Sequence, residues 1–215
     1  MFDTSAYLPP TGDLELIYSD DSLLVVNKPA GLLAVPGRGT DKQDSLSTRL
    51  QFVFPDALVV HRLDMATSGL MVFARGPEIQ RRLSSAFSER TVEKRYKAIV
   101  IGKLEPESGE VSLPIAVDWP NRPLSKIDVV SGKPSLTRYR TLDFNGDNTC
   151  VELEPTTGRT HQLRLHMAAI CHPILGDAFY GDATNSPRLM LHSTSLRFIH
   201  PLTGEQLNFT CDSLF

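Results

Sequence analysis

Short runs of β-branched and aromatic residues recur along this sequence, and they constrain its fold more than any other feature. Nine such runs are predicted to form strands: Leu14–Tyr18, Leu23–Asn27, Leu58–Leu63, Gly69–Ala74, Arg95–Ile101, Leu136–Leu142, Thr149–Leu153, Leu189–Leu196 and Gln206–Phe209. Helical periodicity is found at only three segments: Ser45–Phe54, Pro77–Glu89 and Thr160–Cys171. Because the strands come in runs and do not alternate with helices, the pattern predicts a sheet-dominated α+β fold and disfavours a doubly wound nucleotide fold.

Length and composition indicate one ordinary globular domain over residues 1–215. The chain has 41% hydrophobic and 22% charged residues, and it contains no internal repeat. No apolar run reaches the roughly eighteen residues that a membrane span needs, and the first residues lack a secretory signal, so a cytoplasmic protein without membrane attachment is expected. The three cysteines form no CxxC pair, and His161 and His166 are five residues apart. Neither a disulfide framework nor a metal site is indicated.

Charge is segregated along the chain although the formal net charge is only −3. Between Arg75 and Lys103 there are eight basic and three acidic residues, and between Asp118 and Arg140 five basic and two acidic ones. One interpretation is a cationic face that binds phosphates. The alternative is a solvated surface with ordinary ion pairs.

The segment Val59–Gly69 combines a cation, a carboxylate and a polar turn. If its first half is a strand, alternation places Arg62 and Asp64 on one face and His61 on the other. The hydroxyl of Thr67 and the backbone donors of the turn could orient the carboxylate. A plainer interpretation is that Asp64 only caps the turn and pairs with Arg62.

A second polar segment, Gly158–Met167, is predicted to form a helix with a cap near Thr160. Its buried stripe consists of Leu163, Met167 and Ile170. Arg164 lies beside this stripe, where a guanidinium is unfavourable unless a carboxylate meets it. Asp64 is the most attractive partner, although surface arginines are common on amphipathic helices.

Two predicted strands carry further candidates. Tyr96 shares a strand face with Ala98 and Val100, and it could place its ring in a cleft or simply fill the core. The run Leu189–His192 is by itself a strand like many others.

Taken together, five elements occur in one order along nearly the whole chain: Asp20–Leu32, His61–Gly69, Lys94–Tyr96, Gly158–Met167 and Leu189–Ser193. In this combination the chain resembles the RluA-type pseudouridine synthases. The stretches Asp118–Pro123 and Ser131–Pro134 resemble, more narrowly, a short member that modifies both tRNA anticodon loops and 23S ribosomal RNA. The first element begins by residue 20, so no S4-type RNA-binding domain is expected in front of it.

The resemblance implies a pseudouridine synthase fold, a mixed, mostly antiparallel sheet with a central catalytic cleft and flanking helices. It implies RNA as partner, a stem-loop of tRNA or of 23S ribosomal RNA or both, and a monomer without cofactor or metal. Asp64 would be the catalytic carboxylate, either attacking the sugar or removing its C2′ proton, and these two routes stay open.

The other residue roles follow from the same resemblance. Arg164 would hold Asp64 ionised, and Tyr96 would stack on the uracil and relay the C5 proton. Arg62 would fill the gap that the flipped base leaves, and His61, Thr67 and Leu191 would complete the substrate pocket.

Two other classes remain as alternatives. An N-glycoside hydrolase needs a second carboxylate about 5–10 Å from the first, and the motifs contain none. A non-catalytic RNA-binding module would need only the basic stretches, and Asp64 would then be a handicap.

Overall fold

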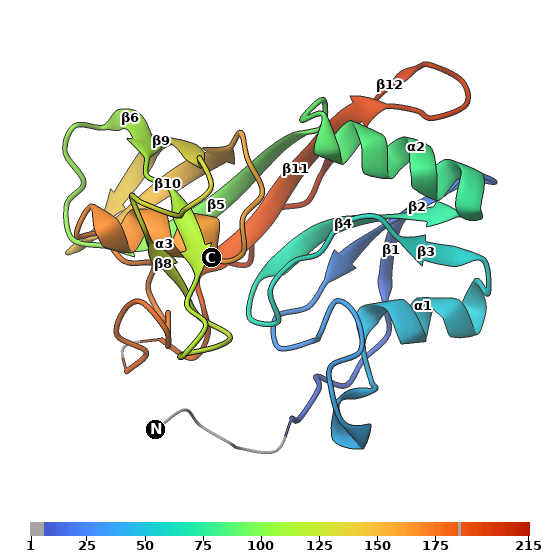
Figure 1. The fold of residues 1–215 in the computed structure, drawn as a ribbon, viewed down its shortest axis with the longest axis horizontal. Coiled ribbons are helices and arrows are strands. Elements are labelled where there is room, and N and C mark those ends of the chain that lie inside the picture. Colours follow the sequence, from blue (N-terminus) through green and yellow to red (C-terminus); the bar gives the residue numbers. More distant parts are fainter. Residues whose placement is uncertain (1–6, 185) are drawn as a thin grey trace. The chain divides into compact units, whose positions relative to one another are not determined.

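The computed structural model describes residues 7–184 and 186–215, and these form two compact units. Unit 1 contains the chain up to Val92 together with Phe198–Cys211, and unit 2 contains Glu93–Arg197 together with Asp212–Phe215. Both mix strands and helices (Figure 1), which confirms the predicted α+β class. That the whole chain acts as one domain stays a prediction. None of the helices within the described ranges is both long and apolar enough to cross a membrane.

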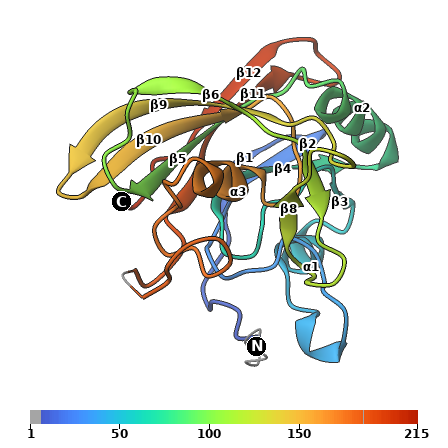
Figure 2. The ribbon, with the colours of Figure 1, turned by 60° about the vertical axis from the view of Figure 1, so that its left-hand side comes forward.

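The core of unit 1 is an antiparallel sheet of four strands: β1 (Glu15–Ser19), β2 (Leu23–Lys28), β3 (Ala57–Val59) and β4 (Ser68–Arg75). Both β1 and β4 pair with β2, and β3 pairs with β4. Two helices, α1 (Leu46–Val53) and α2 (Pro77–Ser88), lie on opposite sides of these strands (Figures 1 and 2). Because helices cover both faces, β2 and β4 are apolar along almost their whole length and do not alternate.

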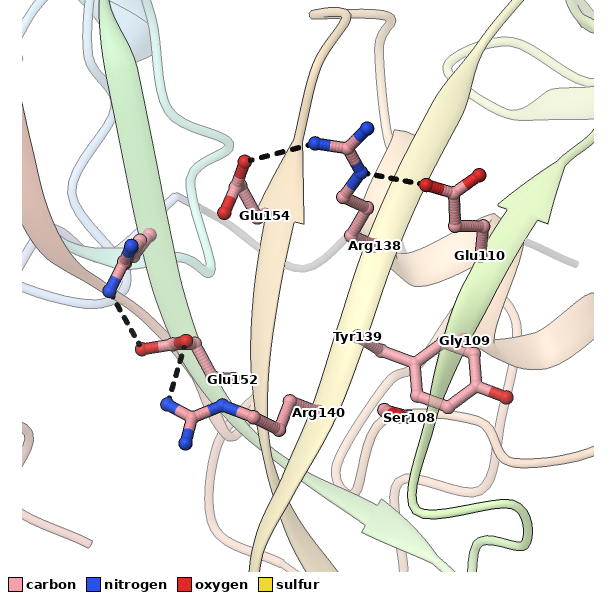
Figure 3. A pocket seen from close by; sticks show the side chains of 9 residues that line it. Ser108, Gly109, Glu110, Arg138, Tyr139, Arg140, Glu152 and Glu154 are labelled. Carbon is pink, nitrogen blue, oxygen red and sulfur yellow. Dashed lines mark hydrogen bonds and ion pairs between the residues drawn. The ribbon is translucent and has the colours of Figure 1, made fainter.

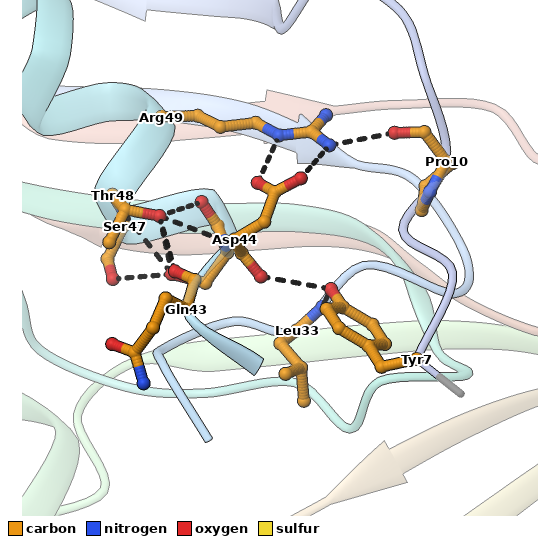
Figure 4. Close-up of polar contacts among 9 residues, drawn as sticks. Tyr7, Pro10, Leu33, Gln43, Asp44, Ser47, Thr48 and Arg49 are labelled. Atoms are coloured by element: carbon orange, nitrogen blue, oxygen red, sulfur yellow. Dashed lines mark hydrogen bonds and ion pairs between the residues drawn. The ribbon is translucent and has the colours of Figure 1, made fainter. Parts of the chain in front are cut away.

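Residues near the start of the chain are bound to the first turn of α1 (Figure 4). The amide of Thr48 donates to the Ser45 hydroxyl at 3.3 Å, and the amide of Ser45 donates to the Thr48 hydroxyl at 2.9 Å. This reciprocal capping makes Ser45 the cap at which α1 begins, in agreement with the predicted start of this helix. The guanidinium of Arg49 binds both carboxylate oxygens of Asp44 at 2.7 Å and donates to the carbonyl of Pro10.

Unit 2 has an antiparallel sheet in the order β11–β5–β10–β9–β6. Its strands are β5 (Glu93–Ile101), β6 (Ser108–Ser112), β9 (Leu136–Asn145), β10 (Asn148–Pro155) and β11 (Leu191–Ile199) as far as Arg197. Helix α3 (Gln162–Ala169) packs on β9 and β10, and a separate hairpin is formed by β7 (Ile115–Val117) and β8 (Ser125–Ile127). One sheet face is therefore buried and the other is open, so burial alternates along β10.

The open face carries a charge ladder, which we define as six residues: Glu110, Arg138, Glu154, Arg95, Glu152 and Arg140 (Figure 3). These residues line a shallow depression of about 520 Å³. In the strand register Arg138 stands opposite both Glu110 and Glu154, and Arg140 stands opposite Glu152. Each exposed pair contributes about 0.2–1 kcal/mol.

The local predictions agree with the structure at most elements and differ at three places. The strand expected at Leu58–Leu63 ends at Val59, because the following residues form a loop. The third helix begins at Gln162 after His161, whose backbone is left-handed with φ 57°, and Thr160 is not its cap. Strands β6, β7 and β8 were not predicted. The ring of Phe209 in β12 (Gln206–Thr210) packs on Tyr18 and completes unit 1.

Candidate active site

Asp64 lies on the loop between β3 and β4 in unit 1, and its residue is half-buried. Hydrogen bonds fix the backbone on its C-terminal side: the amide of Thr67 donates to the Asp64 carbonyl at 3.1 Å, and the amide of Gly31 donates to the Met65 carbonyl at 2.8 Å. Thr67 is buried at the start of β4, as a positioning role requires. The loop is therefore held in one conformation that presents the carboxylate.

A buried lysine also holds this loop in place, and the sequence analysis assigned it no role. Lys28 is fully buried at the end of β2, and its ammonium donates to the carbonyls of Pro29, Leu32 and Met65 at 2.9, 2.7 and 3.0 Å. Charge-assisted hydrogen bonds of this kind are about twice as strong as neutral ones. Because Met65 follows Asp64 directly, Lys28 is a positioning residue for the carboxylate. The sequence signals for it were its place between an apolar run and a proline and its position within the Asp20–Leu32 element.

Replacing Lys28 by Met is expected to lower both stability and turnover. The change leaves buried carbonyls without their donor, each at about 1–3 kcal/mol, and it releases the Met65 backbone. Denaturant unfolding and single-turnover kinetics measure the two effects. Exposed Lys42→Met is the matched control and should change neither. Wild-type kinetics in the Lys28→Met enzyme would show that Lys28 does not position Asp64.

The two residues before Asp64 differ in their surroundings. Arg62 is exposed and has no hydrogen bond or ion pair anywhere in the described part of the chain, so the plainer interpretation of an Arg62–Asp64 pair is wrong. The His61 ring stacks on Phe87 of α2 at 4.3 Å, and its Nε2 accepts a hydrogen bond from the amide of Val72 in β4. These contacts fix the ring inside unit 1, and a contact of His61 with substrate stays a prediction.

In unit 2 the sheet brings two predicted residues to one face. Tyr96 stands opposite Ser193 and Ala98 stands opposite Leu191 in the β5–β11 register. Because residues two apart on a strand share a face, Tyr96 and Leu191 lie on the same side, and both are at least nine-tenths buried. Tyr96 also stands opposite Leu153 of β10, which places its ring on the apolar side of the sheet.

Arg164 is buried on α3, and its partner within unit 2 is Asp177. The guanidinium makes two hydrogen bonds to the carboxylate: Nε to Oδ2 at 2.8 Å and Nη2 to Oδ1 at 2.7 Å. Both side chains are at most 5% exposed. The prediction that Arg164 needs a carboxylate partner is correct, but Asp177 was not identified as a partner from the sequence. Helix α3 is also buried all round over Gln162–Met167, not only along the predicted stripe.

Aromatic side chains and backbone amides complete the surroundings of this ion pair. The Arg164 guanidinium lies 4.9 Å from the ring centre of Phe179 and 5.5 Å from that of Tyr180. Burial by itself would raise the pKa of Asp177, but the Arg164 guanidinium and the amides of Phe179 and Tyr180 outweigh it, so the pKa is lowered. Asp177 therefore stays ionised.

A tight backbone turn explains why Asp177 can reach Arg164. Gly176, just before it, has φ +77°, and a Cβ there would lie 2.0 Å from the carbonyl oxygen of Arg188. Only glycine fits this position. An aspartate directly after a glycine was the available signal, but its partner could not be identified from spacing.

Acid is expected to destabilise the fold in two steps. Burial lowers the pKa of His166 below its ordinary 6.5. When the pKa of a group is lower in the folded state than in the unfolded state, the group stabilises the fold at pH values above its unfolded-state pKa. This stabilisation is lost as the pH falls through the folded-state pKa. Stability should thus decline below pH 6.5 through His166, at up to about 1.4 kcal/mol per pH unit for one proton. Asp177 should add a second decline below its ordinary 3.8.

Urea unfolding over a pH series measures this decline. In His166→Gln the first step should disappear while the second remains. A stability that stays level or rises between pH 7 and 5 would contradict the assignment of His166 as a neutral buried group.

The predicted residues thus form two sets. His61, Arg62, Asp64 and Thr67 lie on or beside one loop of unit 1. In unit 2, Tyr96 and Leu191 share a sheet face, and Arg164 lies on the helix that packs on the same sheet. The Asp64–Arg164 ion pair and the central cleft would join the two units, and both stay predictions.

Comparison with known proteins identifies the family to which these residues belong. The family model of RNA pseudouridylate synthase matches residues 22–169, which include Asp64, Tyr96 and Arg164. The chain is 47% identical over 214 residues to the dual-specificity RNA pseudouridine synthase RluA of Escherichia coli (strain K12), covering 97% of this chain and 98% of that protein. It is 48% identical over 214 residues to the protein of the same description from Haemophilus influenzae, with the same coverage.

Solved structures agree with the sequence comparison. Human RNA pseudouridylate synthase domain containing 1 superimposes with a TM-score of 0.78 at 31% identity, covering 96% of this chain and 86% of that one. The human domain containing 4 gives 0.72 at 26% identity, covering 92% and 88%. The chain therefore belongs to the RluA-type RNA pseudouridylate synthase family, and it is an RNA-modifying isomerase.

Proposed function

We propose that this enzyme converts a uridine in the loop of an RNA stem-loop to pseudouridine, with tRNA anticodon loops and 23S ribosomal RNA as its substrates. The support for two substrates is the similarity to relatives that are dual-specificity RNA pseudouridine synthases. A monomer in the cytoplasm, where tRNA and ribosomes meet, is part of the same proposal.

Asp64 is the catalytic carboxylate in this proposal. The reaction breaks the C1′–N1 bond, turns the uracil over and joins C1′ to C5. The C5 proton is then lost and N1 takes up a proton, so that atoms and charge balance and the product is an isomer of the substrate. A carboxylate can serve either by attacking C1′ or by taking the C2′ proton. The observation that carries the assignment is the loop held by Lys28, which presents Asp64 on a fixed backbone.

The other residues take roles that suit their surroundings. Arg62, exposed and unpartnered within the described residues, occupies the space in the RNA that the flipped uridine leaves. Tyr96 stacks on the uracil and relays the C5 proton, and Leu191 supplies an apolar wall on the same face. Arg164, oriented by Asp177, keeps Asp64 ionised. His61 and Thr67 complete the substrate pocket.

The test uses an isolated anticodon stem-loop RNA incubated with the enzyme. Isomerisation leaves the RNA mass unchanged and creates a nucleoside that a carbodiimide labels stably. A hydrolase would lower the mass through base loss, and an RNA-binding module would change nothing. Either of these outcomes would overturn the proposal. A second arm with a 23S ribosomal RNA stem-loop tests dual specificity separately.

A further inference from the structure

Most basic residues that the sequence suggested as a cationic face have acidic partners. In the charge ladder of unit 2, Arg138 contacts Glu110 at 2.7 Å and Glu154 at 3.8 Å, while Arg140 contacts Glu152 at 3.1 Å (Figure 3). A phosphate approaching these arginines would meet the carboxylates as well. The ladder is therefore a poor surface for RNA, and the phosphate contacts of this unit must come from other cations.

Arg159 in the turn before α3 is such a cation. Its residue is half-buried, and within the described ranges its side chain makes one hydrogen bond, a long one of 3.4 Å from Nη2 to the Pro134 carbonyl. Its Nε is buried and has no hydrogen-bond partner among those residues. A guanidinium has five N–H donors, and leaving a buried one unsatisfied is unfavourable. Because Nε itself is buried and the residue as a whole is only half-buried, the Nη donors are the ones that an external acceptor would bind.

The turn that carries Arg159 is held by Gln162. The side-chain oxygen of Gln162 accepts hydrogen bonds from the Arg159 amide at 3.1 Å and from the Thr157 hydroxyl at 2.6 Å. Its side-chain nitrogen donates to the Leu136 carbonyl and to the Thr137 hydroxyl. Beside Arg159, a Cβ placed on exposed Gly158 would have no atom within 4 Å. The turn is thus preorganised and has open space beside it.

A second cation lies next to the residue that Arg159 contacts. Lys133 precedes Pro134, is exposed, and has no acidic partner within the described chain. Two backbone hydrogen bonds with Ile115, at 3.0 and 2.9 Å, fix its position beside β7. By contrast, the guanidinium of Arg122, in the segment between β7 and β8, lies 3.5 Å from the centre of the Trp119 ring.

We propose that Arg159, together with Lys133, which precedes its hydrogen-bond partner Pro134, forms a binding site for a phosphodiester group of the RNA. A fork of guanidinium donors matches phosphate oxygens, and the ammonium adds a second charge. Because Arg159 leads directly into α3, a phosphate bound there is attached to the helix that carries Arg164. The inference rests on the proposed function for the choice of RNA as ligand.

The test compares substitutions of Arg159 and of Arg138, an arginine of the charge ladder. Both are made in the full chain and measured with the same anticodon stem-loop RNA. Equilibrium affinity is measured over a salt series for Arg159→Gln and for the control Arg138→Gln. Losing one phosphate contact should weaken affinity roughly tenfold and reduce the slope of log affinity against log salt by about 0.7–0.9. Arg138→Gln should leave both unchanged.

Further variants keep the site testable if Arg159→Gln fails to fold. Arg159→Lys retains the charge and should keep the salt slope while losing part of the affinity, and Lys133→Gln should reduce the slope. The proposal would be overturned if Arg159→Gln melts like the wild-type protein and keeps both its RNA affinity and the slope of log affinity against log salt. Binding does not depend on the chemistry, so a changed slope without pseudouridine formation would refute the proposed function and leave the phosphate site standing.

Discussion

Replacing Asp64 by Asn is expected to abolish pseudouridine formation while leaving RNA affinity intact or slightly stronger. The amide keeps the size of the side chain but can neither attack C1′ nor accept the C2′ proton. Removing a negative charge close to bound phosphates should favour binding. The backbone of the loop, held by Lys28 and by the amides of Gly31 and Thr67, should stay in place.

Two measurements on one preparation test this expectation. Carbodiimide labelling of a stem-loop reports turnover, and equilibrium binding reports affinity. The control is Asp56→Asn, the same chemical change at an exposed aspartate of unit 1 that pairs with Arg75. Residual Asp64→Asn turnover within tenfold of wild type would remove Asp64 from the catalytic role.

Replacing Arg164 by Met is expected to lower the free energy of unfolding by about 3–5 kcal/mol and to impair turnover as well. The carboxylate of Asp177 is fully buried, and without the guanidinium the amides of Phe179 and Tyr180 are its only remaining donors among the residues that the structure describes. Urea unfolding measures the loss. The exposed control Arg138→Met should cost no more than about 1 kcal/mol.

A double variant separates the two consequences. Arg164→Met combined with Asp177→Leu removes both charges, so much of the lost stability should return because no buried charge is left unpaired. Turnover should not return, since the guanidinium that we propose keeps Asp64 ionised is still absent. Unfolding of the single variant at the wild-type urea concentration would contradict the account of this ion pair, and recovered turnover in the double variant would show that Arg164 acts only through stability.

Local sequence patterns were sufficient for most of the elements. All nine predicted strands and all three helices are present, because apolar periodicity, Pro77 at a helix start and Ser45 at a cap act over a few residues. The strands that escaped prediction, β6, β7 and β8, are three to five residues long and mostly polar or small. They become strands only because a neighbouring strand supplies hydrogen bonds.

Recognising the site needed no tertiary information, but its supporting contacts did. The motifs around Asp64, Tyr96 and Arg164 are contiguous in the chain and could be matched directly to the family. Lys28 reaches Met65 across 37 positions, and Arg164 reaches Asp177 across an irregular segment. Such contacts depend on which distant segments the fold brings together, and no local periodicity in the sequence predicts this.

The charge distribution shows the same division. Counting along the chain predicts a basic stretch from Arg75 to Arg140, and the count itself is correct. In the folded sheet, strand register places Glu110, Glu152 and Glu154 directly opposite the arginines of β9 and neutralises them. The sequence by itself determined the family, most of the elements and the residues that we propose to react. Only the tertiary structure decided which cations stay free for RNA, because neutralisation depends on residues that are distant in sequence and adjacent across strands.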